Sequence, residues 1–177
     1  EKVGAGSITV GDKSLSDWAD KGTPIEMVGA SNNEQEEVEL NDEDIKINSV
    51  KFAWDETGIY IAYDVFDDHL SWVPNSYWNG DGVEIFMTQN TDSSKNLSGL
   101  KVEDPTCMQL FMGDDSCGGC QVVAARTSVE ILDKKEEILM SFWVKEDNKG
   151  YCGEVFIPFT VVPDILAKIE NGEAISL

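Results

Sequence analysis

The sequence predicts an all-β fold, an antiparallel β-sandwich that forms a single domain over residues 1–177. Segments of alternating apolar and polar residues recur along the chain, and short turns rich in Gly, Asn and Asp separate them. With 177 residues the chain is long enough to bury a core without a metal or a disulfide. No internal repeat or linker divides the sequence, so one sandwich is expected.

The clearest strands flank the turn Asp55-Glu56-Thr57-Gly58, and we predict a hairpin there. On its return strand, Ile59 to Phe66, the odd-numbered apolar residues share one face. Trp18 is expected to pack as a plug at the sandwich edge. Further strands are predicted over 7–10, 24–28, 50–54, 83–87, 106–112, 121–128, 138–144, 151–159 and 174–177, a helix over 163–169, and loops over 31–44 and 91–99.

The charge of the chain narrows the class of partner. Its 34 Asp and Glu residues against 13 Lys and Arg give a net charge of −21. Nucleic acids and anionic membrane surfaces are therefore not expected as partners, since both require neutralisation of phosphate charge. No apolar run reaches the length of a membrane span. The chain starts at Glu1 without a methionine or a signal peptide, so we expect a segment of a larger protein.

Four cysteines, Cys107, Cys117, Cys120 and Cys152, leave three states open. The Cys117-Gly-Gly-Cys120 spacing resembles a zinc knuckle, and a four-thiolate zinc site would need the other two cysteines nearby. Two disulfides would suit a secreted domain. Buried reduced thiols are the expected state, because the outer spacings match no tight metal pattern.

The stretch from Tyr77 to Met87 is the best candidate for a functional site. Tyr77 and Trp78 precede a polar turn, and a strand follows in which Glu84 projects opposite Val83, Ile85 and Met87. A flat indole beside a carboxylate suits a sugar, because the ring stacks on C–H faces and the acid accepts hydroxyl hydrogen bonds. The alternative is an ordinary sandwich strand with a rim tryptophan.

Four ordered segments resemble the family 9 carbohydrate-binding modules (CBM9) and their DOMON-like relatives. The resemblance implies a calcium-containing β-sandwich (jelly-roll, DOMON-like) that is appended to secreted polysaccharide-degrading enzymes and has no catalytic activity. The chain differs from the family in two places. Where the family has an arginine after the strand glutamine, this chain reads Gln109-Leu110-Phe111 and lacks that cation. It also lacks an obvious second stacking aromatic near its end. The four segments are Ile8-Thr9-Val10 to Trp18, Val50 to Asp67, Trp78 to Phe86, and Gly150 to Phe159.

The resemblance assigns roles to single residues. Trp78 corresponds to a sugar-stacking aromatic and Glu84 to a hydrogen-bonding carboxylate. Trp72 and Tyr77 are expected to widen the platform, and Asn79 and Gln109 to add polar contacts. A structural calcium ion is predicted from the surplus of acids near strand ends, with Asp64, Asp67 and Asp81 as carboxylate ligands.

The expected function is non-catalytic binding of a polysaccharide or oligosaccharide, which targets the catalytic module of a secreted parent enzyme to plant cell-wall β-glucan or xylan. The alternative is a structural or protein-interaction domain of a larger extracellular protein. Catalysis would need an acid/base pair such as Glu84 with Asp81 or Asp64. Haem binding, known in some DOMON-like domains, would use His69 with a methionine: Met87, Met108 or Met112.

Overall fold

The central hairpin forms as predicted. In a computed structural model, which describes residues 1–25, 31–32, 36–37, 45–88 and 106–173, β4 (Ile45–Trp54) pairs antiparallel with β5 (Gly58–Asp67). The Asp55 carboxylate closes the turn by accepting hydrogen bonds from the N–H groups of Thr57 (2.7 Å) and Gly58 (3.2 Å) and from the Tyr60 hydroxyl (3.0 Å). Burial alone would raise the pKa of Asp55, but these hydrogen bonds outweigh it and lower the pKa.

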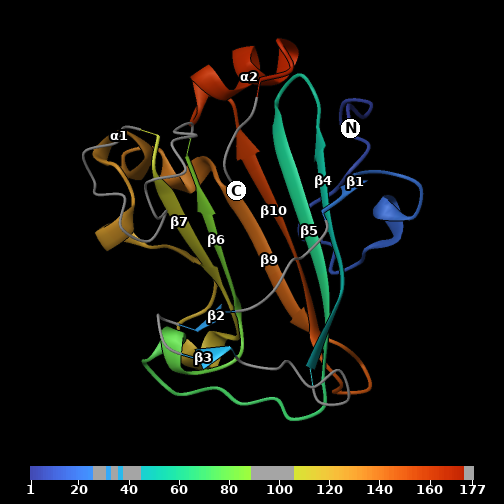
Figure 1. The fold of residues 1–177 in the computed structure, drawn as a ribbon, viewed down its shortest axis with the longest axis vertical. Coiled ribbons are helices and arrows are strands. Elements are labelled where there is room, and N and C mark those ends of the chain that lie inside the picture. Colours follow the sequence, from blue (N-terminus) through green and yellow to red (C-terminus); the bar gives the residue numbers. More distant parts are fainter. Residues whose placement is uncertain (26–30, 33–35, 38–44, 89–105, 174–177) are drawn as a thin grey trace.

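The described strands form two main sheets that face each other (Figure 1). The large sheet has the order β1-β4-β5-β10-β9, and the small sheet has the order β6-β7-β8. A separate two-stranded pair, β2 with β3, lies in the region predicted to be a loop. The remaining strands are β1 (Thr23–Pro24), β2 (Ser31–Asn32), β3 (Glu36–Glu37), β6 (Val83–Met87), β7 (Met108–Met112), β8 (Gln121–Val122), β9 (Leu139–Val144) and β10 (Tyr151–Pro158).

The core lies between the two sheets, which confirms the predicted antiparallel sandwich. Alternation along β5 turns Ile59, Ile61, Tyr63 and Val65 inward, as the sequence predicts. They meet an inward face of the small sheet that is rich in methionine, a side chain that fills irregular gaps. The small sheet contributes Met87, Met108, Leu110 and Met112 to this core, all 0% exposed.

Helices are short and peripheral. The predicted helix near Pro163 is α2 (Pro163–Glu170), and it lies at one end of the sandwich with Ile165 in the core (Figure 1). Pro163 fits the first turn because that position needs no N–H donor. α1 (Val129–Leu132) is a single turn. In the described part of the chain, no helix has the length and apolar character needed to cross a membrane.

The N-terminal segment differs from the prediction. Residues 7–10 do not form a strand; the segment covers the outer face of the large sheet and is joined to it by hydrogen bonds between Val3 and Trp54 (2.8 Å) and between Trp54 and Glu1 (3.0 Å). Trp18 is 2% exposed and packs with Ala53, Tyr60 and Ala62. It is a buried plug as predicted, but it covers interior strands on the outer face of the large sheet and not the sandwich edge. The N-terminal segment attaches to the large sheet through buried side chains such as Trp18. The apolar and polar alternation of the sequence does not reveal this kind of packing.

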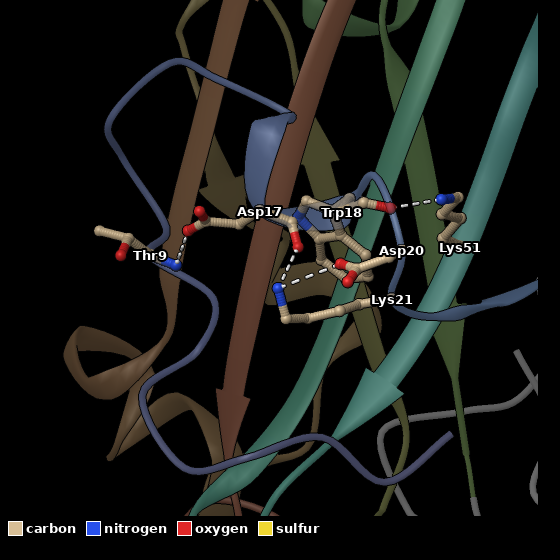
Figure 2. A network of polar contacts seen from close by, with 6 residues as sticks. All are labelled: Thr9, Asp17, Trp18, Asp20, Lys21 and Lys51. Atoms are coloured by element: carbon tan, nitrogen blue, oxygen red, sulfur yellow. Dashed lines mark hydrogen bonds and ion pairs between the residues drawn. The ribbon is translucent and has the colours of Figure 1, made fainter.

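Polar contacts hold this N-terminal layer in place (Figure 2). The Asp17 carboxylate accepts a hydrogen bond from the backbone N–H of Thr9 (3.0 Å). Lys51, from β4, donates to the backbone carbonyl of Trp18 (2.5 Å), and Lys21 donates to that of Asp17 (2.8 Å). Beneath the layer, Trp18 Nε1 donates to Oε1 of Glu154 on β10 (2.8 Å). The tryptophan therefore joins the layer to the sheet by packing and by a buried hydrogen bond.

Glu154 makes the stability of this layer pH-dependent. Its side chain is 0% exposed and its Oε2 atom has no hydrogen-bond partner. Burial raises the pKa of Glu154, and the negative charges of Asp12 and Asp17 add to the rise, against the hydrogen bonds from Trp18 and Gly11. Because the folded pKa lies above the ordinary value of 4.5, the folded state holds the proton more tightly than the unfolded state.

We expect the free energy of unfolding to fall as the pH rises above 4.5 through the raised folded pKa of Glu154. Glu154→Gln has no carboxyl group at this position, so the contribution of Glu154 to the fall should be absent. Urea titrations of both proteins from acid to neutral pH measure it. Identical pH profiles for the two proteins would show that Glu154 does not titrate in this range.

Two further predicted regions differ in detail. The hairpin predicted over 106–112 and 121–128 is present, but β8 ends at Val122 because a 3₁₀ turn, Ala124–Arg126, follows it. The short strand predicted over 24–28 is seen only as β1, since residues 26–28 lie outside the described part. The loop at 91–99 and the strand at 174–177 also lie outside the described residues.

Candidate functional site

The loop between β5 and β6 carries the predicted aromatic residues. Its base is closed where Asp81 N–H donates to the Ser71 carbonyl (2.8 Å) and Ser71 N–H donates back to the Asp81 carboxylate. At its tip, the 3₁₀ turn Tyr77–Asn79 is supported by hydrogen bonds from Asn79 N to Ser76 O (3.0 Å) and from Asn79 Nδ2 to Ser76 Oγ (2.8 Å). Asn79 thus shapes the turn next to Trp78.

Trp78 is the most exposed large apolar side chain of the described residues, at 63%. Its ring stands edge-on to Tyr77, with centroids 4.8 Å apart and planes at 88°. Tyr77 in turn packs on Phe111 of β7, with centroids 4.9 Å apart. Trp78 is therefore not a core residue, and its indole presents a flat apolar surface to solvent.

Glu84 lies on the same side of the molecule as this ring pair. It is exposed, and it is the cross-strand partner of Phe111, so both project from the outer face of the small sheet. Val83, Ile85 and Met87 point to the core, as predicted from alternation. Tyr77 thus packs on Phe111, Glu84 is the cross-strand partner of Phe111, and Trp78 is held next to Tyr77.

Trp72 and Gln109 have more internal positions than predicted. Trp72 is half-buried in a small cluster with Phe111, Cys117 and Val123, and its Nε1 atom is buried without a hydrogen-bond partner. Gln109 is on the same face as Glu84, opposite Phe86, but it is only 6% exposed. Neither side chain presents a broad surface to a ligand: Trp72 packs into the cluster under the aromatic loop, and Gln109 lies beside the segment that holds Val123 and Thr127.

Sequence reasoning missed Phe111, which is 2% exposed and lies beneath Tyr77. Within the sequence it is one apolar residue of a buried strand. Only the register of β6 with β7 shows that it faces outward, beside Glu84 and under the aromatic loop.

The three predicted calcium ligands do not share one place. Asp67 is buried on the inward face of β5, and Asp81 lies beside it. Burial raises the pKa of Asp81, and the negative charge and hydrogen bond of Asp67 add to this effect, against the hydrogen bond from Ser71. Asp64 projects from the opposite face of β5, where it pairs with Lys145 (2.5 Å) and Asn48 (2.9 Å). Asp64 therefore cannot join Asp67 and Asp81 around one ion.

The residues proposed for other chemistries are also separated. Glu84 and Asp64 project from the outer faces of opposite sheets, so they cannot flank one glycosidic bond. The side chain of His69 is 82% exposed, whereas Met87, Met108 and Met112 are enclosed in the core. The structure does not bring this histidine and these methionines to a common haem pocket.

None of the four cysteines forms a disulfide. Cys107 and Cys117 contact backbone carbonyls through their thiols, at 3.4 Å from Arg126 O and 3.0 Å from Asp114 O. Burial raises the pKa of Cys120 and of Cys152 to about 11 in each case. Across the described residues, no group of three or more His, Cys, Asp or Glu side chains is placed to hold a metal. The thiols therefore behave as small buried side chains.

Comparison with known proteins agrees with this geometry. Residues 27–104 match the family described as "Carbohydrate family 9 binding domain-like". No curated protein matches the chain. Two solved structures of a CBM9 from Caldicellulosiruptor kristjanssonii, one in complex with glucose and one with cellotriose, superpose with TM-scores of 0.57 and 0.54.

Both solved structures are 17% identical to this chain and match 89% of it, which corresponds to 68% and 66% of their own lengths. At this identity the likeness concerns the fold, and it agrees with the two-sheet sandwich described above. The ordered motifs, the family match over residues 27–104 and the fold agree: the chain is similar to CBM9 modules, as its sequence predicts.

Proposed function

We propose that the chain binds glucose-containing saccharides, without catalysis, through Trp78 and Glu84. The observation that carries the proposal is an indole that is 63% exposed and is held by Tyr77, which packs on Phe111, the cross-strand partner of the exposed Glu84. Glucose and cellotriose are the ligands of the two similar CBM9 structures, which supports this class of ligand. CBM9 is a family of non-catalytic binding modules.

The chemistry of the two side chains suits a neutral sugar. A pyranose presents a flat face of C–H groups that removes the indole ring from water, while its hydroxyl groups donate hydrogen bonds to the Glu84 carboxylate. One such aromatic contact is worth about 1–3 kcal/mol by analogy with other flat ligands. The net charge of −21 disfavours polyanionic ligands and leaves neutral glycans unopposed.

At the level of the parent protein, we propose that this domain holds the catalytic module of a secreted enzyme on plant cell-wall polysaccharide of the β-glucan or xylan type. The support is the chain's CBM9-like character together with its exposed aromatic platform. Retention on insoluble cellulose and xylan, with and without the domain fused to a reporter, tests this level of the proposal.

Direct titration tests binding itself. Calorimetry with cellotriose and with glucose is expected to show saturable binding, tighter for cellotriose because more of its surface contacts the platform. A panel of soluble β-glucans and xylans in affinity gels extends the test to longer chains. No binding to any of these would leave the structural or protein-interaction domain as the better description.

Glu84→Gln is expected to weaken cellotriose binding by about 0.5–1.5 kcal/mol, less than removal of the Trp78 ring, because the amide still accepts one hydrogen bond but loses the charge-assisted ones. Calorimetry measures this change. Glu136→Gln, an exposed control outside the site, should keep the wild-type affinity. An unchanged affinity for Glu84→Gln would remove this carboxylate from the site.

We also propose that Asp67 and Asp81 hold a structural calcium ion, with backbone carbonyl oxygens as further ligands. Two adjacent carboxylates, one of them 5% exposed, repel each other unless a proton or a cation lies between them. Hard oxygen ligands of this kind suit calcium. A bound ion would also fix the base of the aromatic loop, which Asp81 closes.

Calcium is therefore expected to raise the melting temperature of the wild type, and a chelator to lower it, because the ion binds only the folded state. Asp81→Asn should lose most of this response. Asp64→Asn, whose parent residue pairs with Lys145, should keep it. A melting temperature insensitive to calcium and chelator in the wild type would contradict the proposal.

A further inference from the structure

A pair of glycines lies beneath the aromatic residues of the candidate site. Val83 pairs with Met112, so Gly82 and Gly113 follow as neighbours across the end of β6 and β7. A Cβ atom at Gly82 would lie 2.7 Å from Cε2 of Phe111, and one at Gly113 would lie 2.7 Å from Cε1 of the same ring. The Phe111 ring therefore lies over both glycines, in space that any other residue would fill.

Three rings then follow one another from the sheet to the solvent. Phe111 is 2% exposed and rests on the glycine pair. Tyr77 packs on Phe111 with centroids 4.9 Å apart and planes at 48°, and Trp78 stands edge-on to Tyr77 at 4.8 Å. Only the last of the three is widely exposed.

The remaining contacts of the 3₁₀ turn are local. Its hydrogen bonds join Asn79 to Ser76, and no side chain caps its start. Asp81 and Ser71 hold the base of the loop rather than its tip. Among the described contacts, Trp72 and Tyr77 both pack on the cluster of Phe111, and the packing of Tyr77 is the one made by the turn that carries Trp78.

We propose that Phe111, seated on Gly82 and Gly113, is a positioning residue for Trp78 that sets the orientation of its stacking surface and thereby the affinity for saccharide. This inference rests on the proposed function. Phe111 does not reach the ligand; it acts through Tyr77. Tyr77 accordingly has a supporting role in place of the contact role expected from the sequence.

Phe111→Leu keeps an apolar side chain but removes the flat ring on which Tyr77 packs. We expect its affinity for cellotriose to fall roughly three- to tenfold, since a tilted or mobile indole must be ordered on binding. Near-ultraviolet circular dichroism should show a weaker signal from the Tyr77–Trp78 pair. The control is Ile131→Ala, a core truncation far from this site (1% exposed), which should lose stability and keep its affinity.

Substitutions of Tyr77 test the same inference without changing a residue of the buried strand β7. Tyr77→Leu should lose affinity as Phe111→Leu does, and Tyr77→Phe, which keeps the ring, should restore it. A folded Phe111→Leu with wild-type affinity and dichroism would overturn the inference, as would equal affinities for Tyr77→Leu and Tyr77→Phe. If Trp78→Ala leaves cellotriose binding unchanged, the proposed function fails at this site. If Trp78→Ala weakens binding but the Phe111 and Tyr77 variants keep the wild-type affinity, the inference alone fails.

Discussion

Trp18→Ala is expected to lower the free energy of unfolding by about 3–5 kcal/mol, the range for removing a buried aromatic side chain. Trp18 is 2% exposed, packs against Ala53, Tyr60 and Ala62, and donates a buried hydrogen bond to Glu154. Its loss leaves a cavity under the N-terminal layer and removes the hydrogen bond that Oε1 of Glu154 accepts. Urea unfolding followed by circular dichroism measures the change.

Trp18→Phe is the milder change. It keeps a buried six-membered ring but loses the pyrrole part of the indole and the hydrogen bond to Glu154, so its cost should be smaller than that of Trp18→Ala, about 1–3 kcal/mol. Because Trp18 lies on the large sheet, away from the Trp78 platform, the folded Trp18→Phe protein should bind cellotriose as the wild type does. A Trp18→Ala protein as stable as the wild type would mean that the N-terminal layer is not part of the cooperative fold.

Trp78→Ala is expected to weaken cellotriose binding by about 1–3 kcal/mol, which is roughly five- to more than hundredfold in the dissociation constant. In the proposed site the indole is the stacking surface, and among the described residues no other aromatic side chain is as widely exposed. Because 63% of the side chain is in solvent, its removal should change stability little. The two tryptophans thus serve as controls for each other.

Alternation predicted much of this fold from the sequence. The strands β4, β5, β6, β9 and β10 and the helix α2 were recognisable because each has a regular apolar period and a polar or proline-marked boundary. The segment at residues 7–10 was wrongly predicted as a strand. Its apolar residues match the period of a strand, yet Ile8 is buried by packing with Trp18 and not by pairing.

The site was predicted less completely than the fold. The exposure of Trp78 and the outward projection of Glu84 could be predicted, because an aromatic turn followed by an alternating strand places both from local sequence. Phe111 and its glycine pair could not, because their meeting depends on the register between strands separated by more than twenty residues. The separation of Asp64 from Asp67 follows from strand parity, which the surplus of acids had obscured.

The central claim is that Trp78 is the stacking surface of a saccharide site on the small sheet. The most direct test is calorimetric titration of cellotriose into wild type and into a Trp78→Ala protein shown by thermal unfolding to be fully folded. We predict saturable binding to the wild type and a loss of about 1–3 kcal/mol in the variant at an unchanged melting temperature. Equal affinities in the two folded proteins would contradict the claim.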